Sequence, residues 1–95
     1  MADDKIEELR REIDEINDIL LSLIADRQEI SVAIGAIKVS RGLELYSEER
    51  EAELLEKFRE DALERDLDPE YVEELMRVVL EHSRAAQRRI VGGGS

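Results

Sequence analysis

The sequence predicts an all-α protein in which one long, one short and one medium helix follow each other along the chain. From Ile6 onward, apolar residues recur at alternating spacings of three and four, which is the pattern of one helix face. Charged residues make up 41% of the chain, and Gly and Pro are scarce, a composition typical of helical proteins. Two interruptions, at residues 40–46 and 64–69, separate the three helices.

The long helix is predicted over residues 4–40. Arg27 stands on its apolar face where an apolar residue is expected, so it reaches water, closes a buried ion pair or serves a function. Gly35 costs a helix about 1 kcal/mol relative to alanine, which indicates the close approach of another helix or of a ligand. We call the apolar row the seam; its members are Ile6, Leu9, Ile13, Ile16, Leu20, Leu23, Ile30, Ile34 and Ile37.

The long helix is too long for a compact chain of this size. It would span on the order of 55 Å, whereas a compact chain of 95 residues measures about 30 Å across. Most of the seam then needs a partner, and two-fold dimers are the commonest oligomers. We therefore expect the three helices of each chain to be intertwined in a helical homodimer. The alternative is a long coiled-coil hairpin without a pocket.

The short helix is predicted over residues 48–65. Gly42, which suits left-handed backbone, ends the helix before it. Ser47 is a favourable N-cap, and two glutamates follow in the first turn, where the helix dipole favours negative charge. The apolar face of this helix consists of Leu54, Leu55, Phe58, Ala62 and Leu63.

The medium helix is predicted to begin at Pro69, with Asp68 as its N-cap, and to end near Val91. Residues 92–95, Gly-Gly-Gly-Ser, are typical of a flexible linker or of residues added by cloning, so we expect one domain over residues 1–91. The apolar face of the medium helix consists of Val72, Leu75, Met76, Val79, Leu80, Ala86 and Ile90.

The composition excludes several classes of function. The chain has no Cys and one His, which argues against a disulfide scaffold and a metal site. A formal net charge of −11 disfavours nucleic acid as a partner. No apolar run approaches the ~20 residues of a membrane helix, and the first residues lack the apolar core of a signal peptide. We expect no membrane association and a cytoplasmic location.

Polar residues interrupt otherwise apolar rows on the long and medium helices. Arg27 and Lys38 lie eleven residues apart, so they share one face with Cα atoms about 16 Å apart, and their side chains could converge on a small molecule. On the medium helix the row through Leu80 turns polar at Ser83 and Gln87. These two residues either belong to a site or simply approach water at the helix end.

Taken in order, these motifs resemble the all-α, dimeric chorismate mutase family. The long helix reads LRREIDEINDILLSLIADRQEISVAIGAIK, the short helix opens with SEERE, and the medium helix closes with SRAAQ. The family has an L-R-x-x-I-D-x-I-D-like start followed by an arginine and a lysine, then D-x-x-R-E, then S-x-x-x-Q. The resemblance covers the chain up to Ile90 without a gap. Ser47 and Asn17 stand where the family has aspartates.

The resemblance implies a role for each matching residue. Arg10 matches an arginine that enters the pocket of the other protomer, and its separation of about 25 Å from Arg27 along one helix agrees with that. Arg27 and Lys38 match the arginine and lysine in the middle of the helix, and Gln87 completes the expected catalytic set. The further substrate-binding positions are Ser47, Arg50, Glu51 and Ser83, with pocket walls at Ile34, Leu54 and Leu80.

The implied activity is the rearrangement of chorismate to prephenate in the biosynthesis of Phe and Tyr, which needs no nucleophile, metal or cofactor. Two arginines would hold the two carboxylates of chorismate. Lys38 and Gln87 would donate to the ether oxygen as its bond breaks, and Glu51 would accept from the ring hydroxyl. Two alternatives stay open: an isochorismate-pyruvate lyase on the same fold, and a non-catalytic helical dimerisation module. For Arg50 the alternative is a surface ion pair with Glu48 or Glu49.

Overall fold

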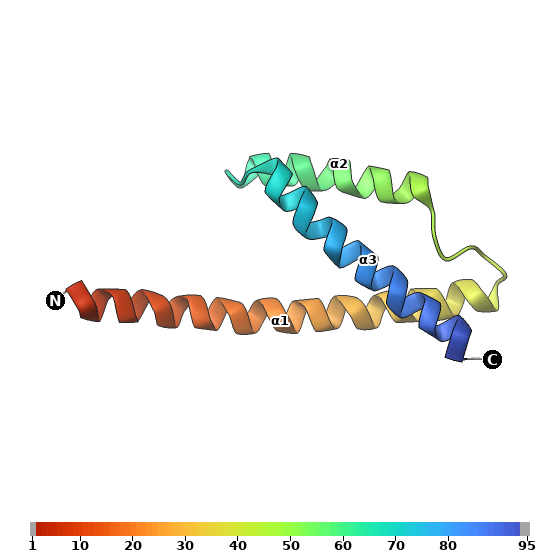
Figure 1. Cartoon of the computed structure of the whole chain (residues 1–95), viewed down its shortest axis with the longest axis horizontal. Coiled ribbons are helices and arrows are strands. Elements are labelled where there is room, and N and C mark those ends of the chain that lie inside the picture. The colour runs from red at the N-terminus through yellow and green to blue at the C-terminus, as the bar shows by residue number, and fades with distance from the viewer. Residues whose placement is uncertain (1, 94–95) are drawn as a thin grey trace. The chain divides into compact units, whose positions relative to one another are not determined.

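The computed structural model describes residues 2–93, and it contains three α-helices (Figure 1). They are α1 (Ala2–Ser40), α2 (Glu48–Glu64) and α3 (Pro69–Gly93). No strand occurs among the described residues. The predicted all-α fold of a long, a short and a medium helix is confirmed. The end of α3 differs slightly from the prediction, because the helix continues to Gly93 instead of ending near Val91.

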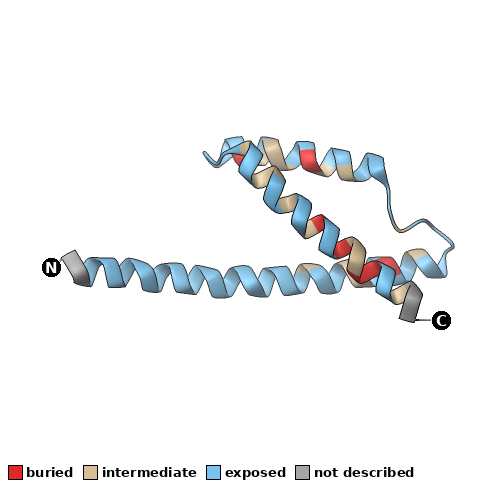
Figure 2. Cartoon of the chain, viewed as in Figure 1, coloured by how far each residue is buried: buried red, intermediate tan, exposed pale blue. Residues whose placement is uncertain are grey.

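The chain divides into an amino-terminal unit, residues 1–30, and a carboxy-terminal unit, residues 31–95. In the amino-terminal unit the seam of α1 is exposed, as the pale blue colour of this helix in Figure 2 indicates. Its large apolar side chains are between 46% and 62% exposed. They are Ile6, Leu9, Ile13, Ile16, Leu20, Leu23 and Ile30. A continuous apolar row of this kind marks an interaction surface more often than a surface facing water.

A glycine closes the end of α1. Gly42 has a φ of 69°, the left-handed region that an L side chain rarely adopts. This conformation lets the Leu43 N–H donate to the Lys38 carbonyl at 2.8 Å, and the Gly42 N–H donate to the Val39 carbonyl at 3.1 Å. The two bonds satisfy carbonyls that have no partner within the helix. The predicted C-terminal role of Gly42 is confirmed.

The N-caps predicted for α2 and α3 are also confirmed. The Ser47 hydroxyl oxygen accepts from the Arg50 N–H at 3.2 Å, and residue 47 itself has extended backbone. Asp68 Oδ1 accepts from the Glu70 N–H at 3.0 Å, and Pro69 is the first helical residue. The side chains at the two cap positions therefore fix where these helices begin.

Buried residues of the carboxy-terminal unit lie on α2 and along α3, which pack against each other (Figure 2). Leu55 and Ala62 of α2 and Leu80 and Ala86 of α3 are buried. Leu63 was predicted on the same face but is 64% exposed. It follows Ala62 by one residue, which turns its side chain about 100° away from the core.

Candidate active site

Gln87 of α3 lies buried against α1 within the carboxy-terminal unit. Only 8% of the residue is exposed. Its Nε2 donates to the Ser31 carbonyl at 2.8 Å and to the Ser31 hydroxyl oxygen at 3.2 Å. A buried amide needs such partners, because an unpaired polar group in the interior costs about 1–3 kcal/mol. Residue 87 was predicted on a row that turns polar, and the structure shows that the row does not simply meet water there.

Gly35 of α1 makes this close approach possible. A Cβ atom at this position would lie 2.9 Å from Gln87 Cγ and 3.3 Å from Ile90 Cδ1. The glycine is buried, although it interrupts a helix in which alanine would be more stable. Of the two explanations that the sequence allowed, the close approach of another helix is therefore confirmed. The approaching side chain is that of Gln87, a predicted site residue.

Lys38 lies near the end of α1 and reaches over the loop that leads to α2. Its side chain is partly buried, and Nζ donates to the Leu45 carbonyl at 3.4 Å. The same residue also offers its own carbonyl to Leu43. Both contacts tie the lysine to the 41–47 segment, so the loop holds the position of the ammonium group.

Arg50 follows the N-cap of α2, and its backbone N–H is the group that Ser47 caps. The residue is exposed, and no ion pair within residues 2–93 involves its guanidinium group. The alternative for Arg50, a surface ion pair with Glu48 or Glu49, is therefore not formed among residues 2–93. An exposed guanidinium group with five N–H donors suits the recognition of a carboxylate.

Glu51 faces α3, where it meets a residue that the sequence did not single out. Glu51 Oε2 lies 3.2 Å from Nη1 of Arg84, and the two side chains are only 18% and 25% exposed. The Arg84 guanidinium carbon lies 4.8 Å from the centroid of the Tyr46 ring. Its Nε is buried without a hydrogen-bond partner. The loop, α2 and α3 therefore meet at Arg84.

The remaining predicted residues differ in their burial. Within the carboxy-terminal unit, Leu80 and Ser83 of α3 are buried, Leu54 of α2 is half-buried, and Ile34 of α1 is 45% exposed. The row formed by Leu80, Ser83 and Gln87 is thus buried along its whole length.

The two remaining predicted arginines, Arg10 and Arg27, belong to the amino-terminal unit. Arg10 is exposed there, and Arg27 is half-buried.

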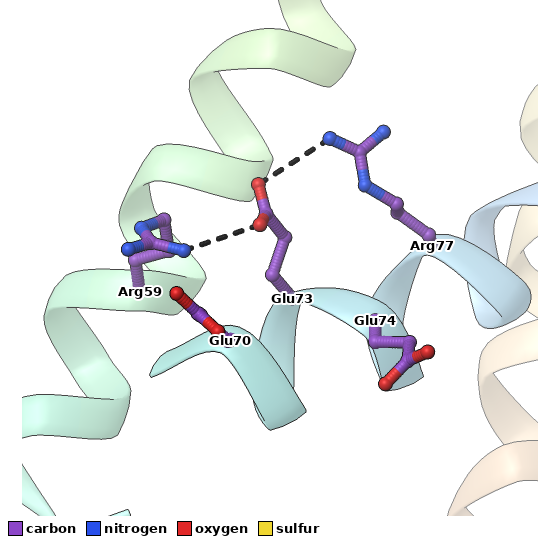
Figure 3. Close-up of a pocket in the computed structure, with 5 residues that line it drawn as sticks. All are labelled: Arg59, Glu70, Glu73, Glu74 and Arg77. Atoms are coloured by element: carbon purple, nitrogen blue, oxygen red, sulfur yellow. Dashed lines mark hydrogen bonds and ion pairs between the residues drawn. The ribbon is translucent and has the colours of Figure 1, made fainter. Parts of the chain in front are cut away.

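Charged side chains of α2 and α3 also line an open hollow of about 410 Å³ (Figure 3). Glu73 lies at its centre and pairs through one oxygen with Arg59 at 3.1 Å and through the other with Arg77 at 3.3 Å. Glu70 and Glu74 complete the lining. Because both arginines are already paired and three carboxylates surround them, this hollow suits a dicarboxylate poorly, and none of the predicted site residues lines it.

A profile of the family described as chorismate mutase type II matches residues 9–88. The chain belongs to the chorismate mutase type II family. The resemblance deduced from the sequence motifs is therefore confirmed, and the match includes every predicted site residue from Arg10 to Gln87.

Three relatives of this chorismate mutase family member differ in the share of their own length that the match covers. Chorismate mutase of Methanocaldococcus jannaschii is 29% identical over 86 residues, which cover 90% of this chain and 87% of that protein. T-protein of Enterobacter agglomerans is 34% identical over 79 residues, 83% of this chain but 21% of that protein. The bifunctional chorismate mutase/prephenate dehydratase of Aquifex aeolicus is 39% identical over 54 residues, 57% of this chain and 15% of that protein.

In this chorismate mutase family member, the sequence did not predict the contacts of Arg84 with Glu51 and Tyr46. Arg84 lies four residues after Leu80 and three before Gln87, so helical periodicity places it on the same face as the other candidates, but nothing in the sequence showed which residue would contact it. Tyr46 lies in a loop, where no periodic pattern applies. The sequence indicated only that an arginine stands between the apolar positions Leu80 and Ala86. Its partner, Glu51 of α2, lies 33 positions away in the sequence.

Proposed function

We propose that this protein catalyses the rearrangement of chorismate to prephenate and serves the biosynthesis of Phe and Tyr. The observation that carries the proposal is the family match over residues 9–88, which includes all the cations, the carboxylate and the amide that this reaction would use. The reaction is unimolecular: one C–O bond breaks, one C–C bond forms, and no group leaves the molecule. The residues therefore need only to hold one conformer and to stabilise developing charge.

Arginines would bind the two carboxylates of chorismate. A guanidinium group matches a carboxylate in a two-bond fork, which fixes orientation as well as position. Arg10 and Arg27 fill this role, and Arg50, whose guanidinium makes no ion pair among residues 2–93, adds a third cation. Local positive charge is needed because the protein as a whole carries −11 and would repel a dianion at long range.

Lys38 and Gln87 would act on the ether oxygen, where negative charge develops as the C–O bond breaks. The amide nitrogen of Gln87 carries two hydrogens, and both acceptors that it meets belong to Ser31. The shorter bond, to the backbone carbonyl, would hold the amide, and the ether oxygen would replace the Ser31 hydroxyl as acceptor of the second hydrogen once the Ser31 side chain turns away. Both donors would then stabilise the transition state more than the substrate.

Glu51, Ser47 and Ser83 would recognise the remaining polar groups of the substrate. The Glu51 carboxylate would accept from the ring hydroxyl. Ser47 uses its oxygen as an acceptor in the N-cap, so its own hydroxyl hydrogen is available to donate. Ile34, Leu54 and Leu80 would pack against the carbon skeleton of chorismate. The serine at position 47, where the family motif has an aspartate, is expected to lower the activity or to shift the specificity.

We also propose that the protein works as an intertwined homodimer in the cytoplasm, with Arg10 of each chain completing the site of the other. The exposure of the α1 seam supports the dimer, because a second seam would remove both rows from water. The cytoplasmic location follows from the biosynthetic role proposed here. Among the described residues, no helix combines the length and the apolar character needed to cross a membrane.

The test is a spectrophotometric assay of chorismate consumption with identification of the product. Prephenate has the same mass as chorismate, so chromatography against a standard must accompany mass measurement. A second reaction with isochorismate, in which released pyruvate is measured, tests the lyase activity. Conversion of chorismate with loss of activity in a Lys38→Ala variant is the expected result. Pyruvate release from isochorismate alone, or no turnover of either compound, would contradict the proposal.

A further inference from the structure

Arg84 contacts both Glu51 and Tyr46. It lies on α3, one residue beyond the buried Ser83, and contacts both the loop before α2 and the first turns of α2. Neither the motif resemblance nor the family assignment gives this residue a role. Its contacts nevertheless involve a carboxylate that the proposed function places against the substrate.

Two interactions hold the guanidinium group of Arg84 in place. On one side Nη1 lies 3.2 Å from Glu51 Oε2, and on another the group lies over the Tyr46 ring, 4.8 Å from its centroid. The attraction between a guanidinium group and the face of an aromatic ring favours this arrangement. The burial of Nε without a partner shows how tightly the group is enclosed, since solvent does not reach this atom.

We propose that Arg84 is a positioning residue that fixes the Glu51 carboxylate for recognition of the substrate's ring hydroxyl. The arginine occupies Oε2 of Glu51 and leaves Oε1 for the hydroxyl of the substrate. It also neutralises the carboxylate, which otherwise repels the two carboxylates of a bound dianion. This inference rests on the proposed function, because it presupposes that Glu51 accepts from chorismate.

The test compares Arg84→Met with Arg88→Met in steady-state kinetics on chorismate. Methionine keeps much of the length of the side chain and removes the charge. Arg88 is an exposed arginine one turn further along α3, so its replacement changes the net charge equally and serves as the control. The contact of Glu51 with the ring hydroxyl exists in the substrate and in the transition state alike. Arg84→Met should therefore raise KM about 3- to 10-fold and change kcat less. Arg88→Met should leave both constants near the parent values.

A double-mutant cycle with Glu51→Gln separates positioning from direct contact. If Arg84 acts through the carboxylate, Arg84→Met should change KM by less than about twofold once Glu51 is glutamine. An undiminished KM effect in that background would overturn the inference, because Arg84 would then act on the substrate itself. Equal kinetics for Arg84→Met and the parent, with only the melting temperature lowered, would also overturn it and leave a purely structural ion pair.

A second variant keeps the experiment decisive if Arg84→Met does not fold. Arg84→Lys retains the charge but lacks the planar group that spans Tyr46 and Glu51, so it should raise KM by a smaller factor that again disappears in the Glu51→Gln background. An unchanged KM for Arg84→Lys, together with an unfolded Arg84→Met, would overturn the inference in favour of a structural role. Failure of the parent protein to turn over chorismate would instead refute the proposed function, so the two failures are distinguishable.

Discussion

The amide of Gln87 is held by one residue of α1, whose backbone carbonyl and hydroxyl oxygens both accept from Nε2. This arrangement sets the direction of the amide before any ligand is considered. An amide donates at every pH, whereas a carboxylic acid donates only when it is protonated. The role of residue 87 can therefore be tested by replacing its amide with a carboxylic acid, which has nearly the same volume.

Replacing Gln87 by Glu should make the activity depend on pH. The introduced acid donates to the ether oxygen only in its protonated form, so kcat/KM should fall as pH rises through the pKa of that carboxyl group. Glutamate in water titrates near pH ~4.3, and burial at this position raises that value. The measurement is kcat/KM of both proteins between about pH 4 and 8. A Gln87→Glu variant with the flat profile expected of the parent would show that residue 87 does not face the ether oxygen.

Replacing Lys38 by Ala should lower kcat. A cation beside the breaking C–O bond gains importance as charge develops, and by analogy with an oxyanion donor its loss should cost on the order of 3 kcal/mol, or more than a hundredfold in rate. Lys57→Ala is the matched control, because Lys57 is an exposed lysine of α2 that, among residues 2–93, forms an ion pair with Asp61 alone. A Lys38→Ala variant in which KM rises while kcat is retained would assign Lys38 to binding alone.

At the scale of the helices, the ends of the elements are determined by single residues. The C-terminus of α2 closes in the same way as that of α1, with Leu67 N–H donating to the Ala62 carbonyl at 2.9 Å and Asp66 N–H donating to the Leu63 carbonyl at 3.2 Å. Here, however, the left-handed position is Asp66, with a φ of 56°. An L side chain in this region carries a strain that glycine does not.

Asp66→Gly should therefore raise the free energy of unfolding by up to about 1 kcal/mol, which corresponds to a melting temperature higher by a few degrees. The matched change in the opposite direction is Gly42→Ala. A Cβ at Gly42 would meet nothing within 4 Å, so only the positive φ opposes the substitution, and stability should fall by a similar amount. Thermal unfolding at one fixed protein concentration measures both variants. A lower melting temperature for Asp66→Gly would show that the aspartate side chain stabilises this turn.

The helix ends were largely predictable from the sequence, whereas the contacts between helices were not. Ser47, Asp68 and Gly42 act on backbone groups within five residues of themselves, so local rules predicted them correctly. Asp66 was not predicted, because an aspartate has several other roles near a helix end. The contact of Glu51 with Arg84 was not predicted either, because it depends on how α2 packs on α3, and neither spacing nor propensity contains that information.

For the whole molecule, the notable feature is the seam of α1, because its apolar side chains are not buried by residues of the same chain. About half of each large apolar side chain along it is exposed. We predict that sedimentation equilibrium at micromolar concentration gives twice the 10.9 kDa of one chain. A mass of 10.9 kDa under these conditions would contradict both the dimer and the shared site.

The trans role of Arg10 predicts complementation between inactive variants. Arg10→Ala and Arg27→Ala homodimers should each be inactive, because each lacks one arginine in both sites. After the two are unfolded together and refolded, heterodimers contain one site with both arginines. With random pairing the mixture should regain about one quarter of the parent activity. Heterodimers that form without regaining activity would show that both arginines serve the site of their own chain.

The missing side chain at Gly35 links two positions that lie 52 residues apart in the sequence. A Cβ at residue 35 would lie 2.9 Å from Gln87 Cγ, so an L residue there requires the Gln87 side chain to shift or residue 87 to become smaller. A smaller residue at 87 would lose the amide that bonds to Ser31 and that we propose to serve the reaction. Substitutions at the two positions are therefore coupled, because a change at residue 35 disturbs the side chain at residue 87. Among chains that retain the reaction, we expect glycine at 35 and a long hydrogen-bonding side chain at 87 to be inherited together.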